Sequence, residues 1–168
     1  YEFVAVPVDL LKVIRQVLFE LDALVSQKKL SLELNLDGRL APDTEALNIP
    51  GEEFVFHSML ANLIRNAIEA SPEGGKITVS LVSQPEFSLS IHNFGAIPEN
   101  IRDRFFERYV TSGKERGTGL GVFSARLMAK TMGGDLSFVT DVVAGTTLTF
   151  ALPSKQLQNL ETLQETRS

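Results

Sequence analysis

The sequence has no cysteine, no tryptophan and only two histidines among its 168 residues. Without cysteine the chain has neither a disulfide framework nor a thiolate metal site, and a reducing compartment is permitted. It also lacks any apolar run of the roughly 18 to 20 residues that a helix needs to cross a bilayer. The chain begins at Tyr1 without a signal-peptide pattern, and we therefore expect a fragment of a longer protein.

Positive charge is scarce, because 16 Lys and Arg residues stand against 21 Asp and Glu residues, for a formal net charge of -5. Such a balance does not neutralise a phosphate backbone, so we expect no nucleic-acid partner. A small anionic ligand would need donors that are placed locally. The hydrophobic content of 43% is sufficient for one domain with a single sizeable core.

What the chain does have is regular hydrophobic periodicity. Helical spacing covers residues 8–28, 52–70 and 118–132, whereas apolar and polar residues alternate over 30–36, 77–82, 87–91, 136–138 and 147–152. The runs at 77–82 and 87–91 predict an antiparallel hairpin, and Pro42 and Pro50 predict a loop before the second helix. We expect an α+β fold, a two-layer α/β sandwich in which one mixed, mostly antiparallel sheet is covered on one face by three helices.

Two segments differ from this regular pattern. The stretch at about 95–117 combines Gly, Pro and charged residues and is long for a connection inside a compact domain, which is typical of a lid. From Ser154 onward the chain is polar and rich in glutamine. We therefore expect a domain over residues 1–153 and a polar C-terminal tail over residues 154–168.

Asn62 and Asn66 lie one turn apart in the second predicted helix, on the face opposite its apolar residues. Asn is a poor helix former, so two of them within a helix suggest a role that offsets this cost. An Asn carbonyl oxygen is a hard, neutral ligand that suits Mg²⁺ already held by phosphates. The alternative is a solvated polar face.

Two glycine-containing segments are candidates for ligand contact. Gly117-Thr-Gly-Leu-Gly121 directly precedes a helix, so its backbone N–H groups can approach an anion such as phosphate; the alternative is a flexible turn. Its spacing matches neither the Walker loop nor the dinucleotide fingerprint. The second segment contains Asn93 and Gly95. Gly95 allows close packing of the backbone against a planar ring, and the Asn93 side-chain oxygen can accept a hydrogen bond from an exocyclic amine. The alternative for this segment is a strand-end turn.

In their order along the chain, these pieces resemble the histidine-kinase-like ATPase superfamily, and within it the ATP-binding catalytic domain of sensor histidine kinases, which has a Bergerat-type fold with an ATP lid. The family's N box matches Asn62 and Asn66, its G1 box residues 93–98, its F box residues 105–108 and its G2 box residues 117–121. The resemblance implies nucleotide-binding roles for Asn62, Asn66, Asn93, Gly95, Ile97, Lys114, Gly117, Thr118, Gly119, Leu120, Gly121 and Thr146. It also implies ATP and Mg²⁺ as cofactors, with Asn66 and Asn62 as the metal ligands.

The sequence departs from the family pattern at two positions. Asn93 stands where the commonest form of the G1 box has Asp, and the loss of charge predicts weaker adenine binding. Glu69 stands where several members have a Lys that reaches the phosphates. We therefore expect Lys114, Arg116 and Thr118 to be the local phosphate donors.

Asn62 bears on the reaction, because related ATPases place a water-activating Glu at this position and a carboxamide cannot accept a proton. The resemblance thus implies phosphotransfer to a histidine on a separate dimerisation and phosphoacceptor domain of the same protein, followed by a response regulator. His57 and His92 are expected to have structural or surface roles, so the fragment contains no catalytic residue of its own. We expect a cytoplasmic domain without membrane contact, any membrane anchor lying elsewhere in the full-length protein.

Three other functions remain open at this point. The chain fits a degenerate, non-catalytic nucleotide-binding or docking module, which Asn93 and Glu69 favour. It also fits an anti-sigma-factor serine kinase, although relatives of that kind usually have Glu at the position of Asn62. The third alternative is an ATPase that turns over on its own.

Overall fold

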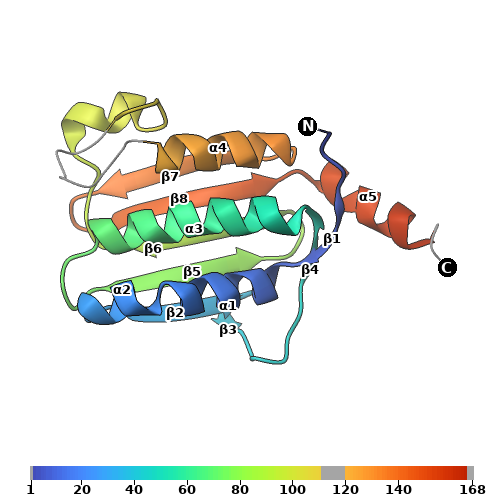
Figure 1. The fold of residues 1–168 in the computed structure, drawn as a ribbon, viewed down its shortest axis with the longest axis horizontal. Helices are drawn as coiled ribbons and strands as arrows, with labels where there is room; N and C mark the ends of the chain where they lie inside the picture. The colour runs from blue at the N-terminus through green and yellow to red at the C-terminus, as the bar shows by residue number, and fades with distance from the viewer. Residues whose placement is uncertain (1, 111–119, 166–168) are drawn as a thin grey trace.

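A computed structural model describes residues 2–110 and 120–165. Its main feature is a six-stranded sheet in the order β3-β2-β5-β6-β8-β7, shown in Figure 1. The strands are β2 (Ser31–Leu36), β3 (Arg39–Leu40), β5 (Lys76–Val82), β6 (Phe87–Asn93), β7 (Asp135–Asp141) and β8 (Gly145–Leu152). All neighbouring strands are antiparallel except the parallel pair β2 and β5.

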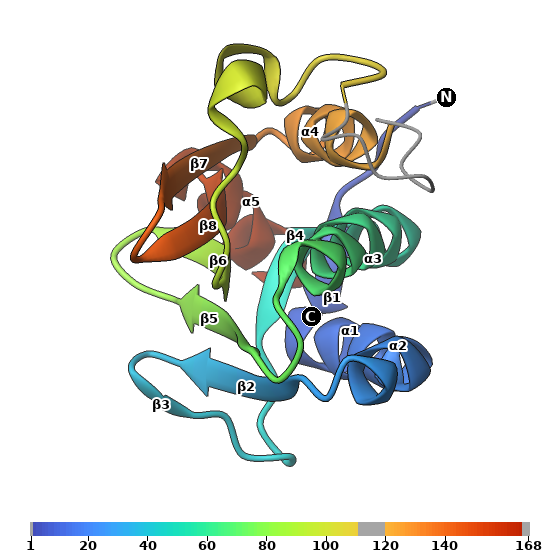
Figure 2. The same cartoon turned by 90° about the vertical axis from the view of Figure 1, so that its left-hand side faces the viewer.

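The helices form the second layer on one face of this sheet (Figure 2). They are α1 (Leu10–Glu20), α2 (Asp22–Gln27), α3 (Glu53–Ala70) and α4 (Gly121–Thr131). A two-layer α+β sandwich with one mixed, mostly antiparallel sheet is therefore confirmed, as is the hairpin of β5 and β6.

The alternation of apolar and polar residues in the central strands explains why only one face is covered. Every second residue of β6 is buried beneath the helices, beginning with Phe87, whereas the serines between them face outward and are half-buried. At the centre of the core, the Phe150 ring lies edge-on to Phe56 of α3 and to Phe87, with ring centroids 6.2 and 6.3 Å apart. The core thus fixes α3 over the middle of the sheet.

The beginning of the chain differs from the single helix predicted over residues 8–28. The Asp9 carboxylate accepts from Lys12 N and so caps α1, while the chain before it forms β1 (Val6–Asp9). The helix is then interrupted at Leu21, which separates α1 from α2. The helical periodicity continues across this interruption, and the interruption is therefore not visible in the pattern.

The loop predicted around Pro50 was wrong in part, because residues 48–51 form β4 (Asn48–Gly51), which pairs antiparallel with β1. Pro7 and Pro50 lie directly opposite each other in this small sheet. Proline lacks an N–H donor and normally argues against a strand, so the pairing could not be recognised from local preference.

Three further elements were not expected, the shortest of which is the two-residue strand β3. The polar tail contains α5 (Ser154–Glu165), which packs near β1 and β4 and places Leu157 against the core. The irregular stretch predicted as a lid contains a short 3-10 helix, η1 (Glu99–Arg104). The boundary at residue 153 and the extent of the lid stay predictions. Within residues 2–110 and 120–165, no helix combines the length and apolarity needed to span a bilayer.

Candidate functional site

The candidate residues that the structure describes come together at one end of the sheet. There β6 ends at Asn93, β8 begins at Gly145, α3 ends at Ala70 and α4 begins at Gly121 (Figure 1). Asn93 and Thr146 are direct cross-strand partners in the register of β6 and β8. Residues that are more than 50 positions apart in the sequence thus share one edge of the fold.

A chain of hydrogen bonds fixes the loop that follows β6. Ile97 N donates to Thr140 Oγ1 at 2.9 Å, the Thr140 and Thr146 hydroxyl oxygens are 2.9 Å apart, and Thr146 Oγ1 donates to Gly95 O at 2.7 Å. Because the Thr146 proton points to Gly95 O, Thr140 must be the donor between the two hydroxyl groups. The loop is therefore attached to both β7 and β8.

Thr140 is the residue of this network that the sequence did not reveal. Its only signal is its position opposite Thr146 in the register of β7 and β8, which requires knowledge of the strand pairing. Thr146, by contrast, lies in a recognisable glycine turn and is 4% exposed.

Two glycines at this end allow backbone segments to approach closely. Gly95 has φ of 121°, and a Cβ atom there would lie 2.6 Å from Ala70 O at the end of α3. Gly145 has φ of 89°, and a Cβ atom there would collide with Asn93 O. Both conformations favour glycine strongly, so these two residues keep the end of β6 against α3 and β8.

The orientation of the Asn93 carboxamide follows from its neighbour. Asn93 is only 2% exposed, and its side-chain Nδ2 donates to Phe94 O at 3.1 Å. A carbonyl oxygen accepts but cannot donate, so the amide nitrogen must face Phe94 and Oδ1 must point elsewhere. Oδ1 accepts no hydrogen bond from another described residue, and it therefore remains as a fixed acceptor.

Asn62 and Asn66 lie on the face of α3 that was predicted. The apolar residues Leu60 and Ile64 are buried, whereas both Asn side chains are half-buried and Glu69 is exposed. Neither carboxamide forms a hydrogen bond with another residue in the described ranges. The two groups thus have no structural hydrogen bond among the described residues, and their carboxamide oxygens are neutral ligands of a type that Mg²⁺ accepts.

The glycine-rich loop before α4 is described only at its end. Leu120 precedes the helix and its carbonyl oxygen accepts from Ser124 N at 2.8 Å, while Gly121 is exposed and a Cβ atom there would meet no described atom within 4 Å. Lys114, Gly117, Thr118 and Gly119 lie outside the described residues, as does Arg116. Their predicted roles in phosphate binding stay predictions.

Aromatic contacts attach the segment after η1 to the rest of the domain. The Phe105 and Phe106 rings pack against Phe138 of β7, with ring centroids 5.1 and 5.6 Å apart. The Arg108 guanidinium group lies over the Phe123 ring of α4 at 4.7 Å, and Arg126 lies over Phe106 at 4.8 Å. The F-box residues thus connect the stretch after β6 to both α4 and β7.

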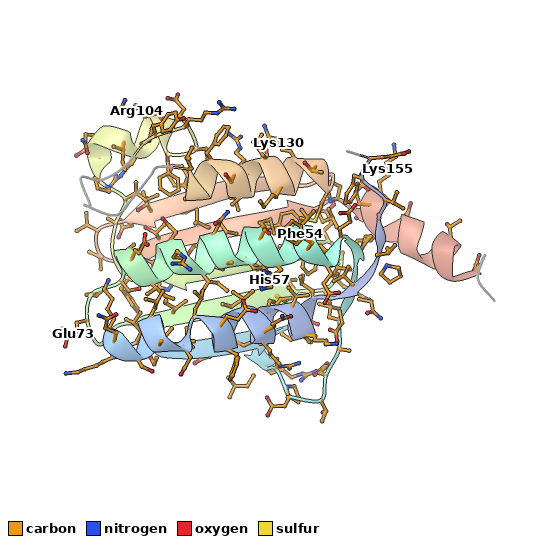
Figure 3. All side chains as sticks on the ribbon, viewed as in Figure 1. Phe54, His57, Glu73, Arg104, Lys130 and Lys155 are labelled. Atoms are coloured by element: carbon orange, nitrogen blue, oxygen red, sulfur yellow. The ribbon has the colours of Figure 1, made fainter. Side chains whose placement is uncertain are left out.

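Both histidines have structural partners. His57 Nε2 lies 2.8 Å from a Glu20 carboxylate oxygen and connects α3 to α1; Figure 3 labels His57 on α3. His92 Nε2 lies 2.6 Å from Ala144 O and so supports the β7–β8 turn. In this turn the backbone N–H groups of Ala144 and Val143 donate to Asp141 and hold the pKa of that carboxyl below its ordinary value.

Known proteins share both the sequence pattern and the fold. The sequence profile of the histidine kinase-, DNA gyrase B-, and HSP90-like ATPase family matches residues 51–156. The sensor histidine kinase WalK of Bacillus subtilis is 38% identical over 109 residues, which cover 60% of this chain and 18% of WalK. Sporulation kinase D of the same organism is 34% identical over 97 residues, covering 56% of this chain and 19% of that kinase. The chain thus spans only a small part of the length of these relatives.

Solved structures agree with this comparison. The catalytic domain of the histidine kinase ThkA has a TM-score of 0.75 and 26% identity, over 91% of this chain and 96% of that one. The mycobacterial sensor histidine kinase MprB has a TM-score of 0.74 and 25% identity, over 89% and 97% of the two chains. The chain therefore belongs to the histidine kinase-, DNA gyrase B-, and HSP90-like ATPase family, as an ATP-binding domain of the sensor histidine kinase type.

Proposed function

We propose that this domain binds ATP together with Mg²⁺ and presents the γ-phosphate for transfer to a histidine on another domain. The fixed carboxamide of Asn93 is the observation that carries the proposal, because its oxygen is left as an acceptor at the buried end of β6. Adenine has an amine donor at C6, whereas guanine has an oxygen acceptor there. Adenine is therefore the base that complements Asn93.

The neighbouring residues fit the other parts of the nucleotide. Gly95, Ile97 and Thr146 hold the loop beside Asn93 in one conformation. Asn66 and Asn62 offer carboxamide oxygens for Mg²⁺, which phosphates would hold at the same time. The proposal assigns the phosphates to the segment before α4 and to the first residue of that helix, with contacts from Lys114, Gly117, Thr118, Gly119, Leu120 and Gly121.

Asn62 supports transfer to a protein nucleophile rather than to water. ATP supplies the phosphoryl group and Mg²⁺ neutralises its charge, while the chain's own residues position both. Asn62 cannot accept a proton from water at neutral pH, and the Nε2 atoms of His57 and His92 are bonded to Glu20 and to Ala144 O. In this proposal the acceptor histidine lies on the dimerisation and phosphoacceptor domain of the same protein.

The similar proteins support the same proposed function. WalK is named a sensor histidine kinase, and full-length ShkA, which shares this fold at 22% identity and a TM-score of 0.75, was solved in complex with AMPPNP. By analogy with two-component kinases, the proposal includes a response regulator as the next partner. It places the reaction in the cytoplasm, where ATP is available, and assigns this domain no membrane contact.

The fixed amide predicts a preference among nucleotides. We expect saturable binding of Mg-ATP and roughly 100-fold weaker binding of Mg-GTP, because guanine would place an oxygen against Asn93 Oδ1. Turning the amide would instead place Oδ1 against Phe94 O. Isothermal titration of both nucleotides, with EDTA added in a parallel run, measures the preference and the need for the metal. Equal affinity for the two bases would contradict the role of Asn93.

The reaction itself predicts a dependence on a second domain. The chain alone is expected to incorporate no label from γ-labelled ATP, whereas addition of a phosphoacceptor domain should give acid-labile phosphohistidine on that domain. Label on the isolated chain would contradict the absence of an acceptor. Binding of Mg-ATP without any phosphotransfer would favour a non-catalytic nucleotide-binding module. Glu69, which is exposed on the same face of α3 as Asn66, is the residue that favours this alternative. Steady phosphate release by the chain alone would favour an ATPase.

A further inference from the structure

Lys28 is far in sequence from the proposed nucleotide-binding residues, yet its side chain is hydrogen-bonded to the C-terminal end of α3. The residue directly follows α2 and is half-buried. Its ammonium group donates to Ile68 O at 2.9 Å, to Glu69 O at 2.9 Å and to Ser71 O at 2.7 Å. An ammonium group has three donors, so these bonds use all of them. The last carbonyls of a helix lack helical partners and form its negative end, which makes a cation favourable there.

The backbone next to Lys28 strengthens the same attachment. Gly74 N donates to Lys28 O, and Ser31 N donates to Gly75 O, both at 2.9 Å. The Lys29 ammonium group also lies 3.4 Å from Glu73, which Figure 3 labels in the turn after α3. The connection between α2 and β2 is therefore bonded to the end of α3 and to the turn that follows it.

The turn that Lys28 closes is also part of the candidate site. Ala70 O is the carbonyl against which Gly95 is packed, so that a Cβ atom on Gly95 would lie 2.6 Å from it. Asn66 lies four residues before Ala70, which is one helical turn. A displacement of this turn would therefore move the Asn66 carboxamide and the surface that supports the Gly95 loop.

We propose that Lys28 is a positioning residue for binding of Mg-ATP. Its ammonium group fixes the last turn of α3, and in this way fixes Asn66 and the Gly95 loop without touching the nucleotide. The inference rests on the proposed function, since it concerns the same site. It differs from direct phosphate contact, because all three Lys28 donors are already bonded to carbonyl oxygens.

The absence of cysteine from the chain allows a specific chemical test. Lys28→Cys removes the ammonium group, and alkylation of the unfolded variant with 2-bromoethylamine, followed by refolding, restores one on a side chain of nearly the same length. We expect Lys28→Cys to bind Mg-ATP about tenfold more weakly and the alkylated form to regain parent affinity. The exposed Lys12→Cys, treated in the same way, controls for the chemistry and should match the parent throughout.

Amide hydrogen exchange gives a second measurement that does not depend on nucleotide. The Ser71 and Gly75 amides, which are bonded within the end of α3 and its turn, and the Gly74 amide, which donates to Lys28 O, should exchange faster in Lys28→Cys and recover after alkylation. Lys28→Gln, which keeps two donors, serves if Lys28→Cys does not fold, and it should bind Mg-ATP more weakly than the parent and exchange these amides faster than the parent; parent-like values in both measurements would overturn the inference.

The outcomes separate the two hypotheses. Parent-like affinity of Lys28→Cys, or an affinity loss that alkylation does not reverse, would overturn the positioning role. If the parent chain binds no Mg-ATP, the proposed function fails, and the exchange rates alone decide whether Lys28 fixes the turn. Unchanged exchange at Ser71, Gly74 and Gly75 would then refute the inference.

Discussion

Replacement of Asn66 by Ala is expected to lower the affinity for Mg-ATP by about 100-fold without destabilising the domain. The Asn66 carboxamide has no hydrogen-bond partner among the described residues and lies half-buried on α3, so its removal breaks no hydrogen bond there. Ala also has a higher helix propensity than Asn by about 0.6 kcal/mol, which should slightly raise the free energy of unfolding. Isothermal titration and urea unfolding measure the two effects, which have opposite directions.

Two control variants sharpen this prediction. Gln16→Ala removes a carboxamide from the exposed face of α1, where it bonds to Glu20, and it should leave nucleotide affinity unchanged. Asn62→Ala tests the second proposed ligand and should weaken binding by a smaller factor, since Asn66 is the ligand we regard as principal. Wild-type affinity of Asn66→Ala would eliminate the proposed metal site.

Replacement of Gly145 by Ala is expected to cost about 3 kcal/mol of unfolding free energy and to weaken ATP binding about tenfold. The new Cβ atom would collide with Asn93 O and lie 3.0 Å from Phe94 Cα. The orientation of the Asn93 carboxamide depends on these two residues, because its Nδ2 donates to Phe94 O. Both the turn and the adenine acceptor should therefore be displaced. Urea unfolding and titration with Mg-ATP measure the two changes.

Gly38→Ala is the matched control for this variant. Gly38 lies in a turn with φ of 82°, close to the 89° of Gly145, but a Cβ atom there meets nothing within 4 Å. This variant should show only the conformational cost of about 1 kcal/mol, and its nucleotide affinity should equal that of the parent. If the two variants lose equal stability and both bind ATP normally, the close approach at Gly145 has no role in the site.

The fold class and part of the site could be predicted because their signals are local. The period of 3.6 in α3 placed Asn62 and Asn66 together on the face opposite Leu60 and Ile64, and burial confirms that face. Alternation in β5 and β6 likewise identified a hairpin and its buried side. Side-chain direction follows from the backbone period alone, so these features require no knowledge of distant residues.

By itself, the sequence determined the α+β class, the main helices and strands, the family and the candidate residues of its motifs. Only the tertiary structure decided that Pro7 and Pro50 pair between β1 and β4, and that the polar tail adds α5. It also decided the roles of Thr140 and Lys28 and the orientation of the Asn93 amide. Each of these depends on a hydrogen bond or a packing contact whose geometry is set only when the chain has folded, and local periodicity carries no information about such contacts.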